Sequence, residues 1–513
     1  MEKDNIFTEF EFKNPPQSYW MASTTPGTQY PALKENLEVD VAIVGGGFVG
    51  ITCAYLLKKE GLKIAILEAD RILQGTTGHT TAKITSQHGL IYDKTKKNMG
   101  ENIAKQYAEA NESAIDKIEE IIKEKNIDCD FERLPAYVYT HEDKYVQQIK
   151  DEAETAASLG IKAHYQETID LPFQVKAAVR FDHQAKFHPR KFLLALAAEI
   201  PGDGSHIFEQ TRIVDLEEGE RCTVLTEDFK RVIAKNVIIA SHYPFYDKTG
   251  LYFARIYPEK SYALGVTIKE RFPNGMYITA EDPGKSLRAQ PFEGGELIIV
   301  SGEHHKTGHG ENTNIHYENL INFVKDTFEV TDIPYRWSTQ DCMTLDGLPY
   351  VGHLTSNTPN VYVATGFCKW GMTNSMASAM IITDLILKGE NPWQDAYNPS
   401  RITPKASAKE FFKENADVAR EFITGKLARV PKDLDIPNGE ARVVSIEGER
   451  MGVYRDEKDK LHFVDTTCTH MRCELKWHAA EKTWDCPCHG SRFTYEGEIV
   501  EGPALKSIKV DVQ

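Results

Sequence analysis

Two short segments near the C-terminal end of the chain each offer one cysteine and one histidine as metal ligands. The first holds Cys468 and His470, and the second holds Cys486 and His489. In this arrangement the two cysteines can bind one iron of a [2Fe–2S] cluster and the two histidines the other, so one iron has softer ligands than its neighbour. The spacing therefore favours an iron–sulfur cluster in this region.

Zinc is the main alternative, because zinc also accepts two cysteines and two histidines. Zinc fingers, however, pair cysteine with cysteine and histidine with histidine along the chain, whereas each segment here holds one of each. A further alternative is that these are ordinary core residues. The mixed order resembles the Rieske family of [2Fe–2S] proteins, and this resemblance implies a small all-β domain over residues 434–513.

The Rieske resemblance assigns roles to four neighbouring residues. Cys473 and Cys488 stand where the cytochrome-bc-like members join their two cluster loops by a disulfide. Two free thiols remain the alternative, since spacing alone does not prove a bond. The Ser491 hydroxyl would hydrogen-bond a cluster sulfide and raise the reduction potential, whereas Phe493 replaces a tyrosine that raises it further in high-potential members. We expect an intermediate value within the range of about −150 to +300 mV.

A second motif lies near the N-terminal end. Residues 37–44 form a mostly apolar predicted strand that runs into a glycine-rich turn, an apolar helix and a second strand. In this pattern Gly45 permits the tight turn, Gly47 lets the backbone approach a pyrophosphate, and Gly50 allows close helix packing. Glu68, at the end of the second strand, is placed to accept hydrogen bonds from a ribose. The set predicts a dinucleotide-binding unit rather than a glycine turn without a ligand.

Three later segments favour FAD over NAD as the dinucleotide. Residues 75–83, 344–352 and 361–374 resemble the second flavin-contacting stretch, the T-x-D-G-x-P-x-x-G signature and the closing motif of the D-amino-acid oxidase and glycine oxidase (DAO) family. The resemblance implies that FAD is also contacted by Thr77, Gly78, His79, Thr80, Ile213, Gly366, Gly371, Met372 and Thr373.

The two resemblances together define the expected fold. It combines an α/β, Rossmann-like FAD-binding domain, interleaved with a mixed-sheet substrate domain, and the all-β Rieske domain. The expected parts are an N-terminal extension (1–37), the flavoprotein (38–395, with nucleotide-binding parts at about 38–95, 190–245 and 340–390), a linker with a helix (396–433) and the Rieske domain (434–513). Residues 94–125 are expected to form two exposed helices.

The substrate-binding residues are indicated less clearly by sequence motifs than the cofactor-binding residues. The DAO family usually holds a substrate carboxylate with an arginine, and the cationic candidates here are Arg255, Lys260 and Arg336. Tyr262 lies in a segment that resembles the family's turn facing the flavin, and His79 stands beside the expected flavin ring. We take His79, Tyr262 and Arg336 as catalytic candidates. The alternatives are that Tyr262 is a wall residue and that His79 only caps a turn.

Covalent attachment of FAD is not expected. Some sarcosine-oxidase relatives hold flavin through a cysteine thioether in this region. Cys342 precedes Asp346 by four residues, which does not fit that spacing. The resemblance therefore implies FAD that dissociates.

Composition limits the partners of the protein. The net charge of −16 and the pI near 5.6 argue against nucleic acid or an anionic membrane surface. The sequence does not start with the basic and then apolar residues of a signal peptide, and no run approaches the ~20 apolar residues that span a bilayer. We therefore expect a cytoplasmic protein that acts on a small molecule.

The combination of the two cofactors predicts a function. Flavin accepts a hydride, two electrons at once, whereas a [2Fe–2S] cluster carries one. We expect an FAD-dependent dehydrogenase that oxidises an amine or amino-acid-like molecule and passes single electrons through the cluster. They would leave by His470 and His489, at an exposed edge, to a soluble one-electron carrier. The alternatives are a reductase that receives electrons through the cluster, an electron-transfer or redox-sensing protein, and a peroxide-forming oxidase.

Overall fold

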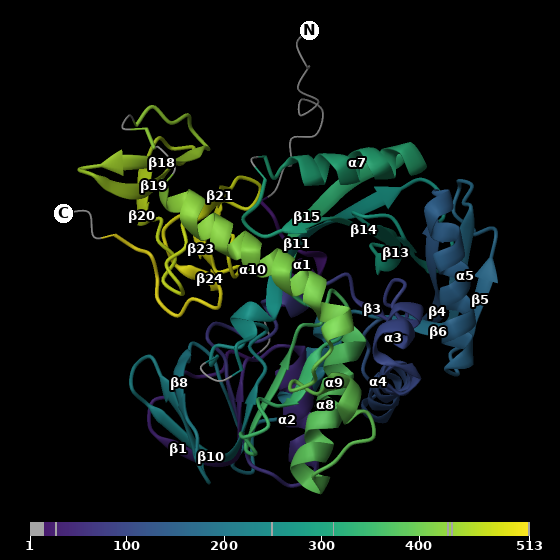
Figure 1. The fold of residues 1–513 in the computed structure, drawn as a ribbon, viewed down its shortest axis with the longest axis horizontal. Helices are drawn as coiled ribbons and strands as arrows, with labels where there is room; N and C mark the ends of the chain where they lie inside the picture. Colours follow the sequence, from purple (N-terminus) through teal and green to yellow (C-terminus); the bar gives the residue numbers. More distant parts are fainter. Residues whose placement is uncertain are drawn as a thin grey trace.

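The computed structural model describes residues 15–25, 28–247, 250–310, 312–427, 430–431 and 434–510. Figure 1 shows the described chain in three parts: a sheet at the lower left, a second sheet at the upper right and a group of short strands at the upper left. These parts correspond to the nucleotide-binding, substrate and Rieske regions expected from the sequence.

The nucleotide-binding sheet is mostly parallel and is buried on both faces. Its described path runs β16-β17-β10-β1-β2-β7, and β1 is parallel to both β2 and β10. Its central strands are rich in valine and isoleucine, as strands covered on both sides require. The strands are β1 (Leu37–Val44), β2 (Ile64–Leu67), β7 (His206–Phe208), β10 (Arg231–Ile239), β16 (Tyr350–His353) and β17 (Val361–Thr365), with β8 (Ile213–Glu217) and β9 (Cys222–Thr226) as a hairpin beside β10.

The substrate sheet is mixed, and its described path runs β15-β11-β14-β13-β12-β4-β6-β3, with β5 beside β6. The two longest strands, β11 and β15, pair in antiparallel fashion at one edge of the path. The strands are β3 (Lys83–Ile84), β4 (Glu132–Thr140), β5 (Ala163–Gln166), β6 (Ala177–Lys186), β11 (Ile256–Ile268), β12 (Met276–Thr279), β13 (Lys285–Phe292), β14 (Gly295–Lys306) and β15 (Val330–Thr344).

Helices cover both sheets. On the nucleotide-binding sheet, α2 (Phe48–Lys59) packs against α6 (Pro189–Ala198) and α8 (Gly371–Lys388). On the substrate sheet, α5 (Asp143–Ser158) packs on β4 to β6, while α7 (Ile315–Thr327) packs on β11 and β14. Because α7 covers one face of β11, the opposite face of this strand is the one that can line the flavin region.

The two helices expected over residues 94–125 are present as α3 (Tyr92–Met99) and α4 (Glu101–Lys125). The expectation that both are exposed is wrong for α4. Tyr107, Ile115 and Ile118 of α4 are buried in the main core. The apolar residues at helical spacing therefore form a core-facing stripe, and only the opposite face carries the charges.

The C-terminal region forms two small antiparallel sheets, which confirms the expected all-β domain. One sheet contains β18 (Ala441–Ile446), β19 (Glu449–Arg455) and β20 (Leu461–Asp465), and the other contains β21 (Lys476–His478), β22 (Thr483–Asp485), β23 (Arg492–Thr494) and β24 (Ile499–Glu501). Trp484 and Phe493 are fully buried in its core. The four predicted cluster ligands lie in the loops on either side of β21 and β22.

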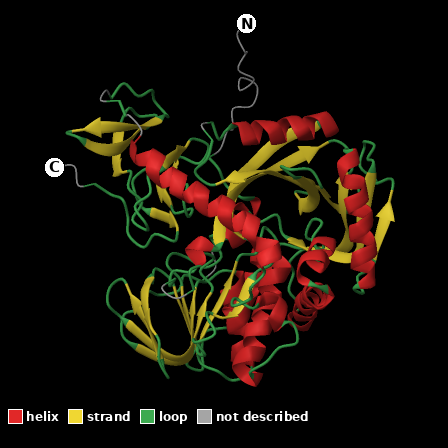
Figure 2. Ribbon diagram, in the orientation of Figure 1, coloured by secondary structure: helices red, strands yellow, loops and turns green. Residues whose placement is uncertain are grey.

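A long helix, α10 (Pro404–Leu427), follows the short α9 (Gln394–Tyr397) and leads from the flavoprotein to the C-terminal strands. Figure 2 shows it as a red helix that crosses the molecule diagonally between these parts. The helix expected in the linker is thus present, and the linker is packed along the molecule rather than extended from it.

The described part of the N-terminal extension is packed on the flavin-contacting segment. The helix α1 (Tyr19–Ala22) lies against the 3-10 helix η2 (Thr76–His79). The Ser18 hydroxyl donates to the Gly78 carbonyl, and the Trp20 indole donates to the Thr80 carbonyl at 2.6 Å. Trp20 is fully buried. This extension therefore holds in place a turn that the sequence assigns to FAD.

Replacing Trp20 by alanine is expected to lower the free energy of unfolding by about 3–5 kcal/mol, because a large buried side chain leaves a cavity. It should also reduce the ratio of bound FAD to protein, since residues 76–80 lose their support. Urea unfolding and flavin absorbance would measure both effects. Phe229 is 81% exposed, so Phe229→Ala is the control and should change stability by less than about 0.5 kcal/mol. Equal losses in the two variants would contradict the prediction.

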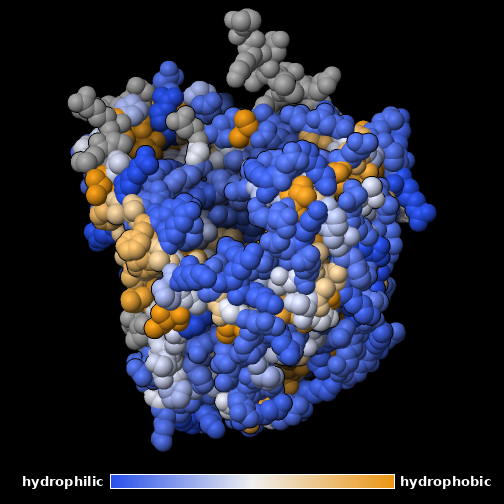
Figure 3. Space-filling model, turned by 45° about the vertical axis from the view of Figure 1, so that its right-hand side comes forward, coloured by the Kyte–Doolittle hydropathy of each residue, from blue (hydrophilic) through white to orange (hydrophobic). Residues whose placement is uncertain are grey.

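In the described residues, none of the helices combines the length and the apolar character needed to cross a membrane. The face drawn in Figure 3 is mostly hydrophilic and is hollowed near its centre.

Candidate flavin cavity and cluster site

The glycine-rich turn after β1 leaves no space for side chains. Gly45 has a φ of +109°, and a Cβ atom there would lie 2.5 Å from the Ala240 carbonyl oxygen. A Cβ atom at Gly50 would lie 1.9 Å from the Gly45 carbonyl oxygen. The turn ends at Phe48, the first residue of α2, whose amide donates to the Thr77 hydroxyl at 3.1 Å, so the helix N-terminus lies beside the flavin-contacting segment. Free amides at a helix N-terminus bind phosphate groups.

Glu68 follows β2 and helps to shape the same turn. Its carboxylate accepts hydrogen bonds from the Gly46 amide at 2.7 Å and the Asp70 amide at 2.9 Å. Burial raises the pKa of Glu68, and these amides oppose the shift. Glu68 also lines the cavity described below. The predicted contact of Glu68 with a ribose remains a prediction.

The segments predicted to contact FAD converge on one cavity of about 1080 Å³. It is lined by Gly45, Gly47, Glu68, Thr77, His79, Thr80, Ile213, Gly371, Met372 and Thr373. Gly50, Gly78 and Gly366 lie behind this wall. At Gly366, for example, a Cβ atom would be 2.3 Å from the Thr344 methyl group. A cavity of this volume exceeds the ordinary range of about 300–1,000 Å³ for ligand pockets, as a dinucleotide together with a small molecule would need.

The walls of the cavity come from all three parts of the protein. The nucleotide-binding sheet contributes the loops after β1 and β10, and the substrate sheet contributes residues of β11, β14 and β15. The C-terminal domain contributes Arg492, Thr494 and residues 499–505. The flavin cavity and the C-terminal domain therefore adjoin.

The four predicted cluster ligands lie together in two loops. Cys468 and Cys486 are buried free cysteines, and their thiols interact with each other. The rings of His470 and His489 are 5.0 Å apart. The Nδ1 atoms of both are buried without a hydrogen-bond partner among the described residues. Two sulfur atoms and two unpaired imidazole nitrogens form the donor set that a mixed-ligand [2Fe–2S] cluster requires.

Ser491 lies beside this donor set. The neighbouring Cys486 thiol first, and then the His470 amide and the Ser491 hydroxyl, lower the pKa of Cys468 to about 7 against the effect of burial. The Ser491 oxygen also accepts a hydrogen bond from the Ala504 amide at 3.0 Å, which fixes its position. The role of Ser491 in setting the potential remains a prediction, as does the lower potential expected from Phe493.

Replacing Ser491 by alanine is expected to lower the reduction potential of the cluster, because a hydrogen bond to the metal site favours its reduced, more negative form. A redox titration followed by the cluster absorbance would measure the shift. Thr469 offers a matched control, since its hydroxyl donates to the Lys506 carbonyl at 2.6 Å instead. An equal shift in Thr469→Val, or none in Ser491→Ala, would contradict the prediction.

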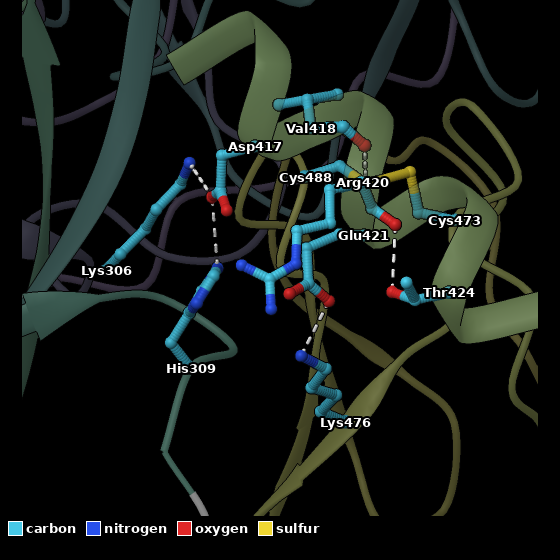
Figure 4. Close-up of a disulfide and its surroundings, with 10 residues drawn as sticks. All are labelled: Lys306, His309, Asp417, Val418, Arg420, Glu421, Thr424, Cys473, Lys476 and Cys488. Carbon is cyan, nitrogen blue, oxygen red and sulfur yellow. Dashed lines mark hydrogen bonds and ion pairs between the residues drawn. A yellow bond between two sulfur atoms is a disulfide. The ribbon is translucent and has the colours of Figure 1, made fainter. Parts of the chain in front are cut away.

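A disulfide joins Cys473 and Cys488, with Cα atoms 6.5 Å apart. Figure 4 shows it beneath α10, where the Val418 carbonyl lies 4.0 Å from the Cys488 sulfur. The adjacent Asp417 of α10 forms an ion pair with Lys306 of β14 at 2.5 Å. The linker helix thus covers the disulfide and ties it to the substrate sheet.

The C-terminal domain is docked by buried polar contacts. Lys260 of β11 and Asp485 of β22 form an ion pair at 3.4 Å, and both side chains are fully buried. The Gln340 side chain of β15 donates to the Gly490 carbonyl at 2.9 Å. A Cβ atom at Gly490 would lie 2.5 Å from the Pro258 Cβ atom. The second cluster loop therefore packs directly on β11 and β15 of the substrate sheet.

The histidine edge of the cluster site faces the flavoprotein. His489 is 2% exposed, and its ring lies 6.2 Å from that of Phe253. The His470 ring lies 6.3 Å from that of Tyr243, a residue that also lines the flavin cavity. The expectation of an exposed edge is wrong for His489, because the flavoprotein covers it. The flavoprotein therefore lies against the histidine side of the cluster site.

Tyr262 lines the cavity, so its catalytic role remains a prediction, but its side chain also helps to dock the Rieske domain. Its ring stacks on His316 of α7, and its hydroxyl lies 2.9 Å from His305 Nε2 and 2.8 Å from His478 Nε2. Its side chain is therefore on the α7 face of the sheet and contacts the Rieske domain through His478. Neighbouring residues of a strand point to opposite faces, so the adjacent Ser261 is the one directed at the other side. Tyr262 is a docking residue.

The other two catalytic candidates lie in different places. Arg336 is not among the residues that line the cavity, and its guanidinium lies over the Tyr317 ring. The structure therefore does not support a catalytic role for Arg336. His79 lines the cavity, but its Nδ1 atom is 2.9 Å from the Gly75 carbonyl oxygen. This contact is the turn-capping arrangement considered as the alternative.

The sequence analysis missed Tyr243, Gln340 and Asp341, which all line the cavity. Tyr243 could have been predicted as a lining residue, because it closely follows β10 and ligands of parallel sheets bind beyond the carboxyl ends of the strands. No sequence signal marked Gln340 as a contact of the cluster loop.

Comparison with known proteins defines the class. Residues 40–385 match the DAO family model, described as FAD dependent oxidoreductase, and residues 426–511 match the Rieske [2Fe-2S] domain. The chain belongs to the DAO family of FAD-dependent oxidoreductases and carries a Rieske domain after it. Its particular combination is found in the Rieske 2Fe-2S protein YhfW of Bacillus subtilis (strain 168), which is 44% identical over 97% of this chain and 98% of its own length.

Two further similarities concern the flavoprotein alone. Gamma-glutamylputrescine oxidoreductase of Escherichia coli (strain K12) is 23% identical over 74% of this chain and 91% of its own length. The crystal structure of glycine oxidase from Geobacillus kaustophilus superposes with a TM-score of 0.58 and 18% identity, covering 72% of this chain and all of that chain. The second similarity shows the DAO fold.

The family assignment settles the cofactors and the kind of activity. The first domain binds FAD, the second binds a [2Fe–2S] cluster rather than zinc, and the protein is an oxidoreductase. The residues present fit both groups, since the glycine turn and cavity suit a dinucleotide and the S₂N₂ donor set suits the cluster.

FAD is expected to be released when the protein is precipitated with acid. Cys342, the cysteine nearest to the region of covalent attachment in some relatives, is buried and is not among the residues that line the cavity. Absorbance of the supernatant and of the redissolved pellet would measure the distribution of flavin. Flavin that stays with the polypeptide would contradict the prediction.

Proposed function

We propose that the protein is a dehydrogenase that oxidises a small amine or amino-acid-like molecule in the flavin cavity and passes the electrons singly through its own Rieske cluster. Bound FAD supplies a two-electron acceptor and the cluster a one-electron carrier. The substrate C–H bond gives up a hydride, its nitrogen gives up a proton, and water hydrolyses the resulting imine. Two molecules of an external one-electron carrier are reduced for each substrate oxidised.

The observation that carries this proposal is that one cavity is lined by both cofactor domains. Residues 499–505 of the Rieske domain line it together with the glycine turn and the start of α8. Gln340, another lining residue, holds the Gly490 carbonyl next to the cluster ligand His489. The distance between the two centres is therefore set by packed protein.

Tyr243 is the residue best placed to connect the two sites. It lines the cavity on one side and meets the ring of the cluster ligand His470 edge-on, with an interplanar angle of 72°. It is only 6% exposed, so water does not separate it from either site. The buried ion pair of Lys260 and Asp485 and the Gln340 contact keep this arrangement fixed during turnover.

Anaerobic stopped-flow mixing of the holoenzyme with N-methylated amines, amino acids and betaine-type compounds tests the proposal. A substrate should first bleach the flavin absorbance and then produce the electron paramagnetic resonance signal of the reduced cluster. Tyr243→Leu should slow only the second phase, and Tyr243→Phe, which keeps the ring, should leave both phases unchanged.

Each alternative predicts a different outcome. A reductase would show no flavin bleaching with any of these compounds but would accept electrons from a ferredoxin-like donor. An oxidase would form peroxide in proportion to turnover, and His489→Ala would not slow it. Either result would overturn the proposal.

A further inference from the structure

Lys83 and Lys369, which line the substrate side of the cavity, already have polar partners. Lys83 Nζ lies 3.2 Å from the Tyr277 carbonyl oxygen and also contacts the Ser286 hydroxyl. Burial lowers the pKa of Lys83 to about 7, with a smaller effect from a neighbouring arginine. Lys369 forms an ion pair with Glu259 at 2.6 Å. Both lysines are therefore already held by groups of the protein, Lys369 by an opposite charge.

The lining arginines are placed elsewhere. They are Arg71, Arg212 and Arg492. Arg71 pairs with Glu209 beside the nucleotide turn, and Arg212 precedes β8. Arg492 belongs to the Rieske domain, where it pairs with Asp485 and Glu501. Within the described residues, no lining arginine comes from the substrate sheet, so this side of the cavity offers no arginine for a substrate carboxylate.

The acidic side chains of the cavity wall are also paired, with one exception. The paired carboxylates of the cavity wall are Glu68 with the Gly46 amide, Asp70 with Gln210, Glu281 with Thr140, Glu481 with Tyr317 and Glu501 with Arg492. Asp341 also lines the cavity. Among the contacts of the described residues, its carboxylate receives no hydrogen bond and forms no ion pair, although His242 and Lys369 act on it electrostatically. A buried carboxylate without a hydrogen bond can be stabilised by a ligand that donates one.

Asp341 lies where the flavin segments meet the substrate sheet. On one side, the Thr76 hydroxyl of the flavin-contacting turn donates to the Gln340 carbonyl at 3.3 Å. On the other, the Cys368 amide, just before α8, donates to the Cys342 carbonyl at 3.2 Å. Asp341 is thus held between the two segments that the DAO domain uses for FAD, and it is only 9% exposed.

We propose that Asp341 binds the ammonium group of the substrate, and that the substrate is an amine without a carboxylate on the reacting carbon. This inference rests on the proposed function, whose substrate class it narrows. A carboxylate on the reacting carbon would meet Asp341 instead of a cation, and like charges in a buried site repel strongly. Charge-assisted hydrogen bonds from an ammonium group to Asp341 would orient the neighbouring C–H bond.

The test uses three small molecules of similar shape that cannot be oxidised, because their central carbon carries no hydrogen. These are tert-butylammonium, pivalate and tert-butanol. Their dissociation constants would be measured from the perturbation of the flavin absorbance in the holoenzyme. The wild-type protein should bind tert-butylammonium much more tightly than pivalate. Asp341→Asn should weaken tert-butylammonium binding by about 10- to 100-fold and leave tert-butanol unchanged.

Two further variants keep the result interpretable. Asp332, on the exposed end of the same strand, gives the matched control Asp332→Asn, which should behave as wild type. Asp341→Glu keeps the charge and should retain the preference for the cation. FAD content and melting temperature should be the same in all variants. Loss of FAD from Asp341→Asn, unchanged binding of tert-butylammonium in that variant, or tight binding of pivalate by wild type would overturn the inference.

The pH dependence gives an independent measurement. Burial raises the pKa of the Asp341 carboxyl to about 6, while His242 and Lys369 oppose the shift and Glu501 and Glu259 add to it. Below about pH 6 the carboxyl gains its proton, so affinity for tert-butylammonium should fall there in wild type and not in Asp341→Asn.

Failure of the proposed function would give a different result from failure of this inference, because neither amines nor amino acids would then reduce the flavin. Equal reduction by both would contradict this inference alone.

Discussion

Replacing Cys486 by serine is expected to remove the cluster while FAD stays bound. A serine hydroxyl remains protonated near neutral pH and is a poor ligand for iron in a sulfur-bridged cluster, whereas the cysteine thiolate is a soft donor. Cys486 is not among the residues that line the flavin cavity. Iron and sulfide analysis should show loss of the metal, and the rhombic resonance signal of the reduced protein should vanish. Flavin should still be bleached by substrate, but reduction of a one-electron acceptor should stop.

Cys222→Ser is the matched control for this change. Cys222 is a buried free cysteine in β9, and its thiol lies 3.9 Å from the Gly219 carbonyl, a partner that a hydroxyl can use equally well. The control should keep its iron, its signal and its electron transfer. Retention of cluster signal in Cys486→Ser would show that the ligand set is different from the one assigned here.

Replacing Lys260 by methionine is expected to loosen the docking of the Rieske domain, at a loss of about 3 kcal/mol. The variant leaves Asp485 buried without its partner from β11, although Arg492 and Thr483 still contact it. The cost arises mainly from the unpaired charge rather than from the lost attraction. Thermal unfolding followed by the cluster absorbance should shift to lower temperature before the flavin signal does, and cluster reduction by the flavin should slow.

A double variant separates these causes. Lys260→Met with Asp485→Asn removes both charges and should recover most of the lost stability, because no unpaired charge remains. The exposed ion pair of Lys59 and Glu124 provides the control, since Lys59→Met should change stability by less than about 1 kcal/mol. A single variant as stable as the wild type would indicate that this pair does not hold the domains together.

The motifs with local geometry could be predicted from the sequence. The glycine turn after β1 and the two cluster loops depend on residues that are close together in the chain, so their types and spacing are informative. The strand over residues 37–44 matches β1, and the strands β18 to β24 fall within the range 434–513 expected for the Rieske domain. Ligands to one metal centre must also satisfy its chemistry, which restricts the possible assignments.

The features that could not be predicted depend on contacts between distant segments. Tyr262 was expected in a turn that faces the flavin, but it lies within β11, where a shift of one residue reverses the face of the strand on which a side chain lies. Tyr262 therefore contacts His478, and Arg336 lies over Tyr317, on the face covered by α7. In the same way, nothing in the cluster loops indicates that the flavoprotein covers His489.

The N-terminal extension also had no signal of its own. Trp20 occupies a buried site between the flavin-contacting turn and the substrate sheet, yet no recurrent motif surrounds it. An isolated tryptophan in a polar segment is compatible with many positions. Its place is determined by the shape of a surface that forms only when the rest of the domain has folded.

The wall that residues 499–505 add to the flavin cavity implies an order of maturation. During synthesis the flavoprotein leaves the ribosome first, while the last segment of the chain is still absent and this side of the cavity is open. FAD can enter at that stage without displacing anything. Iron and sulfide must be delivered later, and the assembly factors that deliver them must reach the two loops before His489 is covered by its neighbour.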